Sequence, residues 1–271
     1  MKHLKHFGIL ALLVCALVFA APLSAFAAAE LSVFAAASMT ESLNKIADLY
    51  KKSAPDVKIV YNFDSSGTLK TQIEQGAECD IFISAGQKQM NALDIKAPAA
   101  ANPDKRDMVM EGTRFNIVSN KVVMIVPKGQ NKKGISDFKD VVTDKVALIA
   151  LGNSDVPVGQ YSVEIYKNLG LWDKLVSLNK ITYASNVKEV LAQTAAGAVD
   201  CGIVYSTDAA TSAKVEVVAD APKGSHKPIT YPAAIMKNTK NAEAAKAFVK
   251  FLQGGESTKV FKSIGFAIPS K

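Results

Sequence analysis

The sequence predicts an α/β fold in which the β-sheets are mostly parallel. Strand-like and helix-like runs alternate along the chain with short connections, and no low-complexity linker interrupts them. The apolar residues of the helical runs recur at i, i+3, i+4 and i+7, which is the spacing of one buried helix face. Ligands of such folds bind at the carboxyl ends of the strands, where the next helices begin.

Short apolar runs mark the expected strands, and periodic runs between them mark the helices. In the first helical run Leu43, Ile46 and Tyr50 share one face, and a later run ends at Gly170, as expected for a helix C-terminus. In chain order the strands are expected at 31–36, 57–63, 80–84, 121–126, 146–150, 181–183, 202–205, 215–218 and 229–235.

Residues 1–27 have the pattern of a secretory signal peptide. Lys2 and Lys5 form the basic start, residues 9–21 are apolar, and Ala25-Phe26-Ala27 supplies the small residues of a cleavage site. The apolar stretch is too short for a convincing membrane span, and no later run approaches that length. We therefore expect an exported, soluble, periplasmic protein that is cleaved near Ala27.

The charge pattern does not favour nucleic acid as a partner. The chain has 32 Lys and Arg against 25 Asp and Glu, a net charge of +7, but only Arg106 and Arg114 are arginines. Proteins that bind nucleic acid usually cluster arginine on one face, and no such cluster is present in the sequence. Cys79 and Cys201 would remain after cleavage, and we expect two buried thiols rather than a disulfide framework.

The sequence gives little support for an enzymatic function. A serine hydrolase needs a nucleophile, a positioned base and an orienting group, but the mature chain has one histidine, His226, and no Gly-x-Ser-x-Gly motif. His226 and the two distant cysteines do not make a zinc ligand set. We expect His226 to lie at the surface, and neither a catalytic residue nor a site for a metal cation is predicted.

Four expected helix starts carry polar or helix-initiating residues. Ser38 stands three residues before Glu41 in a capping-box pattern, Ser66 opens the next helix, Pro157 suits a first helical position, and Asn186 precedes a fourth helix. Each could be an ordinary cap, worth about 1 kcal/mol. Alternatively, helix starts that face one cleft would hold an anion with their unpaired N–H groups.

Five motifs, in the same order, resemble the molybdate-binding periplasmic proteins of ABC importers. They are Phe34-Ala-Ala-Ala-Ser38, Ser65-Ser66-Gly-Thr-Leu69, Asp80-Ile-Phe-Ile-Ser84-Ala85, Val156-Pro-Val-Gly159-x-Tyr161 and Gly202-Ile-Val-Tyr205-Ser-Thr-Asp208. The resemblance implies the two-lobed type II periplasmic-binding fold, with two mixed, mostly parallel sheets and the ligand between the lobes. Lobe 1 would comprise residues 28–117 and 222–271, lobe 2 residues 118–221, with crossovers near 114–121 and 221–228.

The resemblance also implies a ligand site made of neutral donors. Ser38 and Ser66 would bind the oxyanion from lobe 1, Val158 and Val187 would donate backbone N–H groups from lobe 2, and Tyr205 would donate its hydroxyl. The implied ligand is molybdate or tungstate, and no further cofactor is expected.

The resemblance finally implies a role in transport. The anion would close the hinge between the lobes, and the closed monomer would dock on a membrane permease served by a separate ATPase subunit. Two alternatives keep the same fold: a binding protein for sulfate, phosphate or an organic anion, and a sensory ligand domain. A sensor would normally carry a DNA-binding or membrane segment, and the sequence has neither.

Overall fold

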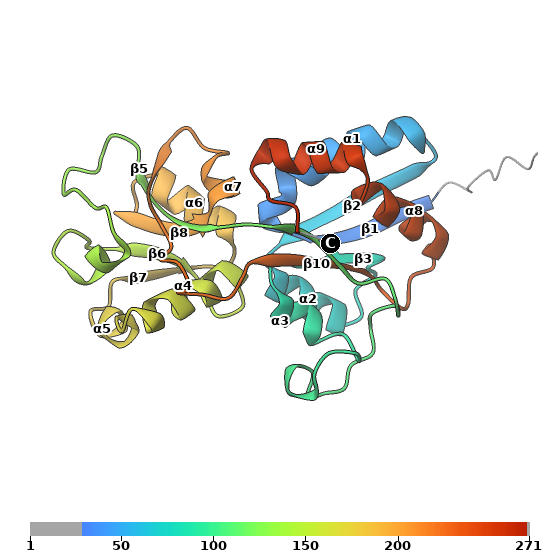
Figure 1. The fold of residues 1–271 in the computed structure, drawn as a ribbon, viewed down its shortest axis with the longest axis horizontal. Coiled ribbons are helices and arrows are strands. Elements are labelled where there is room, and N and C mark those ends of the chain that lie inside the picture. The colour runs from blue at the N-terminus through green and yellow to red at the C-terminus, as the bar shows by residue number, and fades with distance from the viewer. Residues whose placement is uncertain (1–28, 270–271) are drawn as a thin grey trace, which may run out of the picture.

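The computed structural model describes residues 29–269. It contains two five-stranded sheets, each with helices on both faces, that form two lobes lying side by side (Figure 1). The α/β fold with two lobes predicted from the sequence is thereby confirmed. The expected signal peptide, residues 1–27, lies outside the described residues. Within residues 29–269, none of the helices has the length and apolar character needed to cross a membrane.

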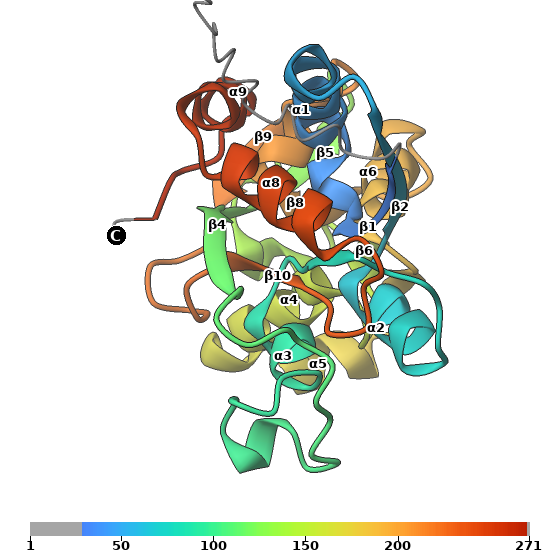
Figure 2. The ribbon, with the colours of Figure 1, turned by 90° about the vertical axis from the view of Figure 1, so that its right-hand side faces the viewer.

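The sheet of the first lobe has the strand order β2-β1-β3-β10-β4, and β10 alone runs opposite to the other four. Helices α1, α8 and α9 cover one face, and α2 and α3 cover the other (Figure 2). The strands are β1 (Ala29–Ala36), β2 (Val57–Asp64), β3 (Ile81–Ile83), β4 (Phe115–Ser119) and β10 (Thr230–Ile235). The helices are α1 (Thr40–Ser53), α2 (Ser66–Glu74), α3 (Gln87–Asn91), α8 (Ala242–Leu252) and α9 (Gly255–Ile264), with short 3₁₀ turns η1 (Ala37–Met39) and η2 (Ala99–Ala101).

The sheet of the second lobe repeats this plan with the order β7-β6-β8-β5-β9, and here β5 runs opposite to the others. Helices α4 and α5 lie on one face and α6 and α7 on the other (Figure 1). The strands are β5 (Val122–Pro127), β6 (Ile149–Gly152), β7 (Ile181–Ala184), β8 (Cys201–Tyr205) and β9 (Val215–Asp220). The other elements are α4 (Pro157–Asn168), α5 (Trp172–Ser177), α6 (Val187–Ala195), α7 (Ser206–Ala209) and the 3₁₀ turn η3 (Phe138–Val142).

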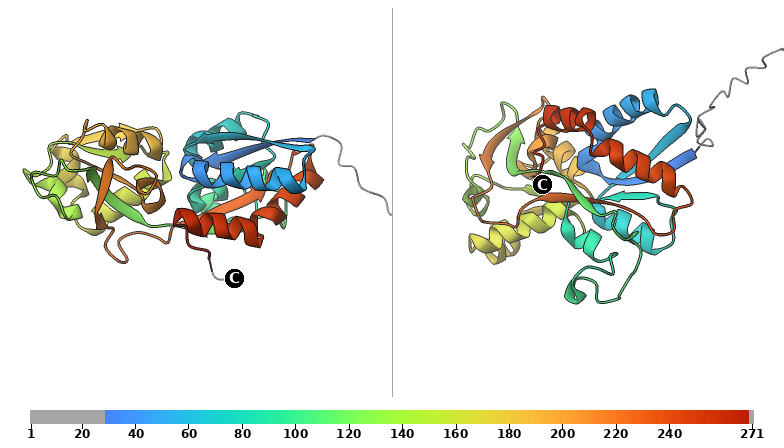
Figure 3. Two further views of the ribbon diagram at one scale, coloured as in Figure 1. Left: turned by 90° about the horizontal axis from the view of Figure 1, so that it is seen from above. Right: turned by 45° about the vertical axis from the view of Figure 1, so that its right-hand side comes forward.

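The chain passes between the two sheets through two connections. Residues 120 and 121 join β4 to β5, and residues 221–229 join β9 to β10. Seen from above, the two lobes lie side by side and these segments run between them (Figure 3). In each sheet the antiparallel strand is the one that follows a connection. The chain enters that lobe at the face towards the other lobe, so this strand starts where the parallel strands end.

One strand was not predicted from the sequence, whereas both cysteines are buried as expected. Strand β4 (Phe115–Ser119) was not expected, because it is short and carries an exposed polar residue in a weakly apolar run. Cys79 and Cys201 are free and buried. Burial raises the pKa of the Cys79 thiol to about 12, so it stays protonated and packs as a small apolar group.

Candidate functional site

The five residues that the resemblance implicates lie around one cavity between the lobes. Ser38 and Ser66 reach it from the first lobe, and Val158, Val187 and Tyr205 reach it from the second. All five are buried. The rest of the lining consists of Ala36, Ala37, Asp64, Ser65, Ala85, Val156 and Pro157.

Ser38 does not cap the helix that follows it, so the expected capping box with Glu41 is wrong. Ser38 lies inside the 3₁₀ turn η1, and the N-cap of α1 is Met39, which makes no side-chain cap bond. Instead, the Ser38 hydroxyl lies 3.0 Å from the hydroxyl of Tyr231 on β10. Asn120 donates to that same Tyr231 oxygen at 3.2 Å. Tyr231 can therefore give its own proton to Ser38, which leaves the Ser38 proton free for an acceptor in the cavity.

Ser66 is the first residue of α2, while Ser65 is its N-cap. The Ser65 hydroxyl accepts from the N–H of Thr68 at 3.1 Å. The Ser66 hydroxyl accepts from the N–H of Ala85 at 2.9 Å, a bond that ties α2 to the end of β3. Since a hydroxyl has one proton to donate, Ser66 can still donate towards the cavity.

Two helix starts supply the backbone donors of the second lobe. Helix α4 begins with Pro157 at its first position and has no side-chain cap, and Val158 follows. Helix α6 begins at Val187, and its N-cap Asn186 accepts from Glu189 rather than from Val187. The N–H groups of Val158 and Val187 belong to first turns, where the helix itself offers no acceptor. Both helix starts therefore present N–H groups, with the positive end of the helix dipole, at the cavity.

Tyr205 is the polar group of the cavity most in need of a partner. It ends β8, is 1% exposed, and its hydroxyl has no hydrogen-bond partner among residues 29–269. Burial raises its pKa well above the usual value, so the phenol stays protonated and acts as a donor. An unpartnered buried hydroxyl costs about 1–3 kcal/mol, which an acceptor in the cavity would recover.

The cavity is small and holds no cationic side chain. Its volume is about 10 Å³, far below the ~300–1,000 Å³ of pockets that take organic ligands. Neither lysine nor arginine is among the described residues that line it. The acidic side chain of the lining, Asp64, accepts from the N–H of Ser65 at 2.7 Å and from the Asn186 amide of the other lobe at 3.4 Å. The arrangement suits a small acceptor-rich ion held by neutral donors.

The two lobes approach closely beside this cavity because Gly67 has no side chain. A Cβ atom at Gly67, the second residue of α2, would lie 2.2 Å from the carbonyl oxygen of Asp155 in the other lobe. No real Cβ tolerates such a contact with backbone. The sequence alone does not indicate this role of Gly67, because Asp155 is distant from it in the chain.

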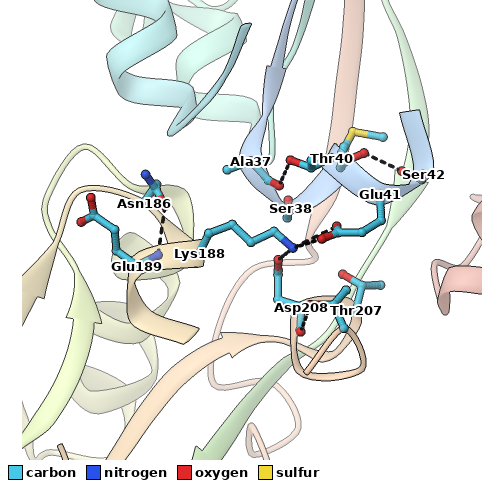
Figure 4. Close-up of polar contacts among 12 residues, drawn as sticks. Ala37, Ser38, Thr40, Glu41, Ser42, Asn186, Lys188, Glu189, Thr207 and Asp208 are labelled. Atoms are coloured by element: carbon cyan, nitrogen blue, oxygen red, sulfur yellow. Dashed lines mark hydrogen bonds and ion pairs between the residues drawn. The ribbon is translucent and has the colours of Figure 1, made fainter. Parts of the chain in front are cut away.

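A charged cluster borders the cavity and was not anticipated. Lys188 Nζ lies 2.8 Å from Glu41 Oε1 of the first lobe and 3.1 Å from Asp208 Oδ1 of the second (Figure 4). Asp208 is fully buried, and apart from this ammonium no donor among the described residues reaches its carboxylate. The sequence offered a weak signal, since Glu41 and Lys188 follow Ser38 and Val187 closely.

The pKa values of the cluster follow from burial and from the sharing of one cation. Burial raises the pKa of Asp208 to about 6, because the single ammonium, which Glu41 also engages, does not offset the loss of water. For Lys188, burial alone would lower the pKa, but the charges of Asp208 and Glu41 outweigh it and hold the pKa above its ordinary value. Lys188 is therefore charged at neutral pH.

Among the described residues, His, Cys, Asp and Glu side chains do not form a group of three that could hold a metal ion.

Comparisons with known proteins identify the family and support the fold. The model of the bacterial extracellular solute-binding protein family matches residues 31–267. The molybdate-binding protein ModA of Haemophilus influenzae is 36% identical over 95% of this chain and 96% of its own, and that of Escherichia coli is 38% identical over 86% of each. The solved periplasmic molybdate-binding protein of Azotobacter vinelandii superposes with a TM-score of 0.75 at 27% identity, covering 89% of this chain and all of its own.

Replacing Asp208 by asparagine should change how stability depends on pH. An acid with a raised pKa binds its proton more tightly in the folded protein, so its contribution to stability falls as pH rises through about 4 to 6. The Asp208→Asn variant lacks this loss. The difference in free energy of unfolding, variant minus wild type, should therefore be about 2 kcal/mol larger at pH 7.5 than at pH 4.5. Denaturant titrations at both pH values measure this difference, and a constant difference would contradict it.

Proposed function

This chain belongs to the family of bacterial extracellular solute-binding proteins, and we propose that it captures molybdate and delivers it to an ABC importer. The family consists of solute-binding proteins rather than enzymes, which agrees with the absence of a catalytic motif in the sequence. Tungstate has the same charge and tetrahedral shape, and we propose it as a second ligand.

The observation that carries the proposal is the donor set around the small cavity. Ser38, Ser66 and Tyr205, each with a hydroxyl group, line it together with Val158 and Val187, whose N–H groups belong to the first turns of α4 and α6. Molybdate is a dianion at neutral pH and carries no proton, so it needs donors only. Neutral donors and helix dipoles can hold it without a countercharge in the cavity.

Size provides the discrimination against sulfate and phosphate in this proposal. Backbone donors at helix starts cannot move without moving the helix, so they reach an oxygen shell of one radius. Sulfate is smaller than molybdate and would leave some donors unpaired. Phosphate is close to sulfate in size and would leave donors unpaired in the same way.

Delivery follows from closure of the lobes. We place the moving bodies at residues 28–117 with 222–271 and at 118–221, joined by the two connections. Because the donors are divided between the bodies, an anion that bridges them favours the closed form. The closed monomer, exported after cleavage near Ala27, would then dock on a membrane permease that works with a separate ATPase subunit.

Calorimetric titration of residues 28–271 with separate solutions of molybdate, tungstate, sulfate and phosphate tests the ligand. We expect tight one-to-one binding of the first two anions and no measurable binding of the others. Tight binding of sulfate or phosphate would keep the fold and replace the assigned ligand. If folded, ligand-free protein bound none of the four, the oxyanion site would be wrong.

Replacing Ser66 by alanine should weaken molybdate binding. The variant loses one hydroxyl donor to a charged ligand, which is worth about 1–3 kcal/mol, or roughly 5- to 150-fold in the dissociation constant. The matched control is Ser42→Ala, because Ser42 is also a buried serine of the first lobe but bonds to Met39 away from the cavity. Equal affinities of the two variants would remove Ser66 from the site.

Replacing Gly67 by alanine should also weaken binding, but without loss of stability. The added Cβ meets the Asp155 carbonyl only when the lobes are closed, so full closure is blocked. In the open form, alanine in a helix is favoured over glycine by about 0.5–1 kcal/mol. We expect at least a tenfold loss of molybdate affinity by calorimetry, with an unchanged or higher melting temperature of the ligand-free protein. Wild-type affinity in this variant would show that closure does not require the contact.

A further inference from the structure

One ion pair joins the two lobes directly beside the cavity. Glu41 lies in the first turn of α1, three residues after Ser38, and Lys188 is the second residue of α6, next to Val187. Lys188 Nζ contacts both carboxylate oxygens of Glu41, at 2.8 and 2.9 Å (Figure 4). The pair therefore connects two segments, one in each lobe, that carry the proposed anion donors Ser38 and Val187.

We propose that Lys188 is a positioning residue for anion capture, and that its ion pair with Glu41 is a latch that holds the lobes closed. The latch does not touch the anion. It acts by keeping the donor groups of Ser38 and Val187 at the distance that they have in the closed form. The part that concerns the anion rests on the proposed function, whereas the part that concerns closure does not.

The partition of the cluster between the lobes gives the latch its action. Asp208 lies on α7 in the same lobe as Lys188, so the contact between them persists when the hinge opens. Glu41 lies in the other lobe, so its contact with Lys188 is lost on opening. Asp208 is 0% exposed and Lys188 is half-buried, so their contact holds the Lys188 ammonium near the cavity in the open form as well. Because the lysine side chain is already ordered there, it loses little conformational entropy when it pairs with Glu41 again.

The charge of Glu41 makes the latch distinguishable from simple electrostatics. A carboxylate near a dianion repels it, so removing that charge should tighten binding if Glu41 acts through its field alone. Loss of a latch has the opposite sign, because the closed form that retains the anion becomes less populated. The sign of the effect therefore decides between the two.

The test compares Glu41→Gln with Glu243→Gln. Glu243 is the second residue of α8, as Glu41 is of α1, and it also pairs with a lysine, Lys246, at 2.8 Å. That pair lies within one lobe. The control thus removes the same charge, at the same helix position, from an ion pair of the same length.

We expect Glu41→Gln to release molybdate about three to ten times faster than wild type in stopped-flow experiments, in keeping with the loss of one partly exposed ion pair. Glu243→Gln should release it at the wild-type rate. In a Lys188→Gln background, Glu41→Gln should no longer accelerate release. Slower release, tighter binding or an unchanged rate in Glu41→Gln would overturn the latch.

A second measurement keeps the latch separate from the identity of the ligand. The distance between spin labels on the two lobes, measured in ligand-free protein, reports the closed fraction directly. Glu41→Gln should lower the closed fraction and should weaken the change of the closed fraction with salt concentration. Glu243→Gln should leave both quantities as in wild type. If wild type bound no oxyanion, the proposed function would fail and this comparison would still decide, since equal closed fractions in wild type and Glu41→Gln overturn the latch.

Discussion

The cavity depends on helix starts whose N–H groups have no acceptor within their own helices. In both sheets, parallel strands end at the face between the lobes, and η1, α2, α4 and α6 begin there. Backbone groups of this kind must be paired when they are buried, so their convergence creates a strong demand for an acceptor. The buried hydroxyl of Tyr205 adds to that demand. The same strand order is repeated in the two sheets, and residues at these helix starts in both lobes line the one cavity.

Cationic charge is kept at the border of the cavity rather than inside it. A lysine within the cavity would attract any anion, whatever its radius, whereas fixed dipoles favour an ion that meets all of them. The ammonium of Lys188 lies between Glu41 and Asp208, so its attraction for an anion is largely balanced by two carboxylates. The cluster therefore contributes to the position of the lobes more than to the field in the cavity.

The sequence was sufficient for the fold class and for the order of most elements, because burial imposes apolar periodicity on strands and helices. It placed the start of α2 at Ser66 correctly, but it failed at the start of α1, where Met39 rather than Ser38 is the N-cap. The residues that contact the site from distant parts of the chain could not be identified from the sequence. The bond from Ser38 to Tyr231 and the contact of Gly67 with Asp155 join residues far apart in the chain, and only the folded lobes bring them together.

Two contacts between the lobes control different properties of the same closed form. The approach of Gly67 to Asp155 is steric: it sets how near the donors of one lobe come to those of the other, and hence which oxygen shell fits. The pair of Glu41 with Lys188 is electrostatic, and it changes how often the closed form is populated without changing its dimensions. A change in the pair should therefore shift the affinity for all oxyanions by one factor. A change in the steric contact alters the ratio between anions of different radius, so affinity and selectivity can vary separately in this fold.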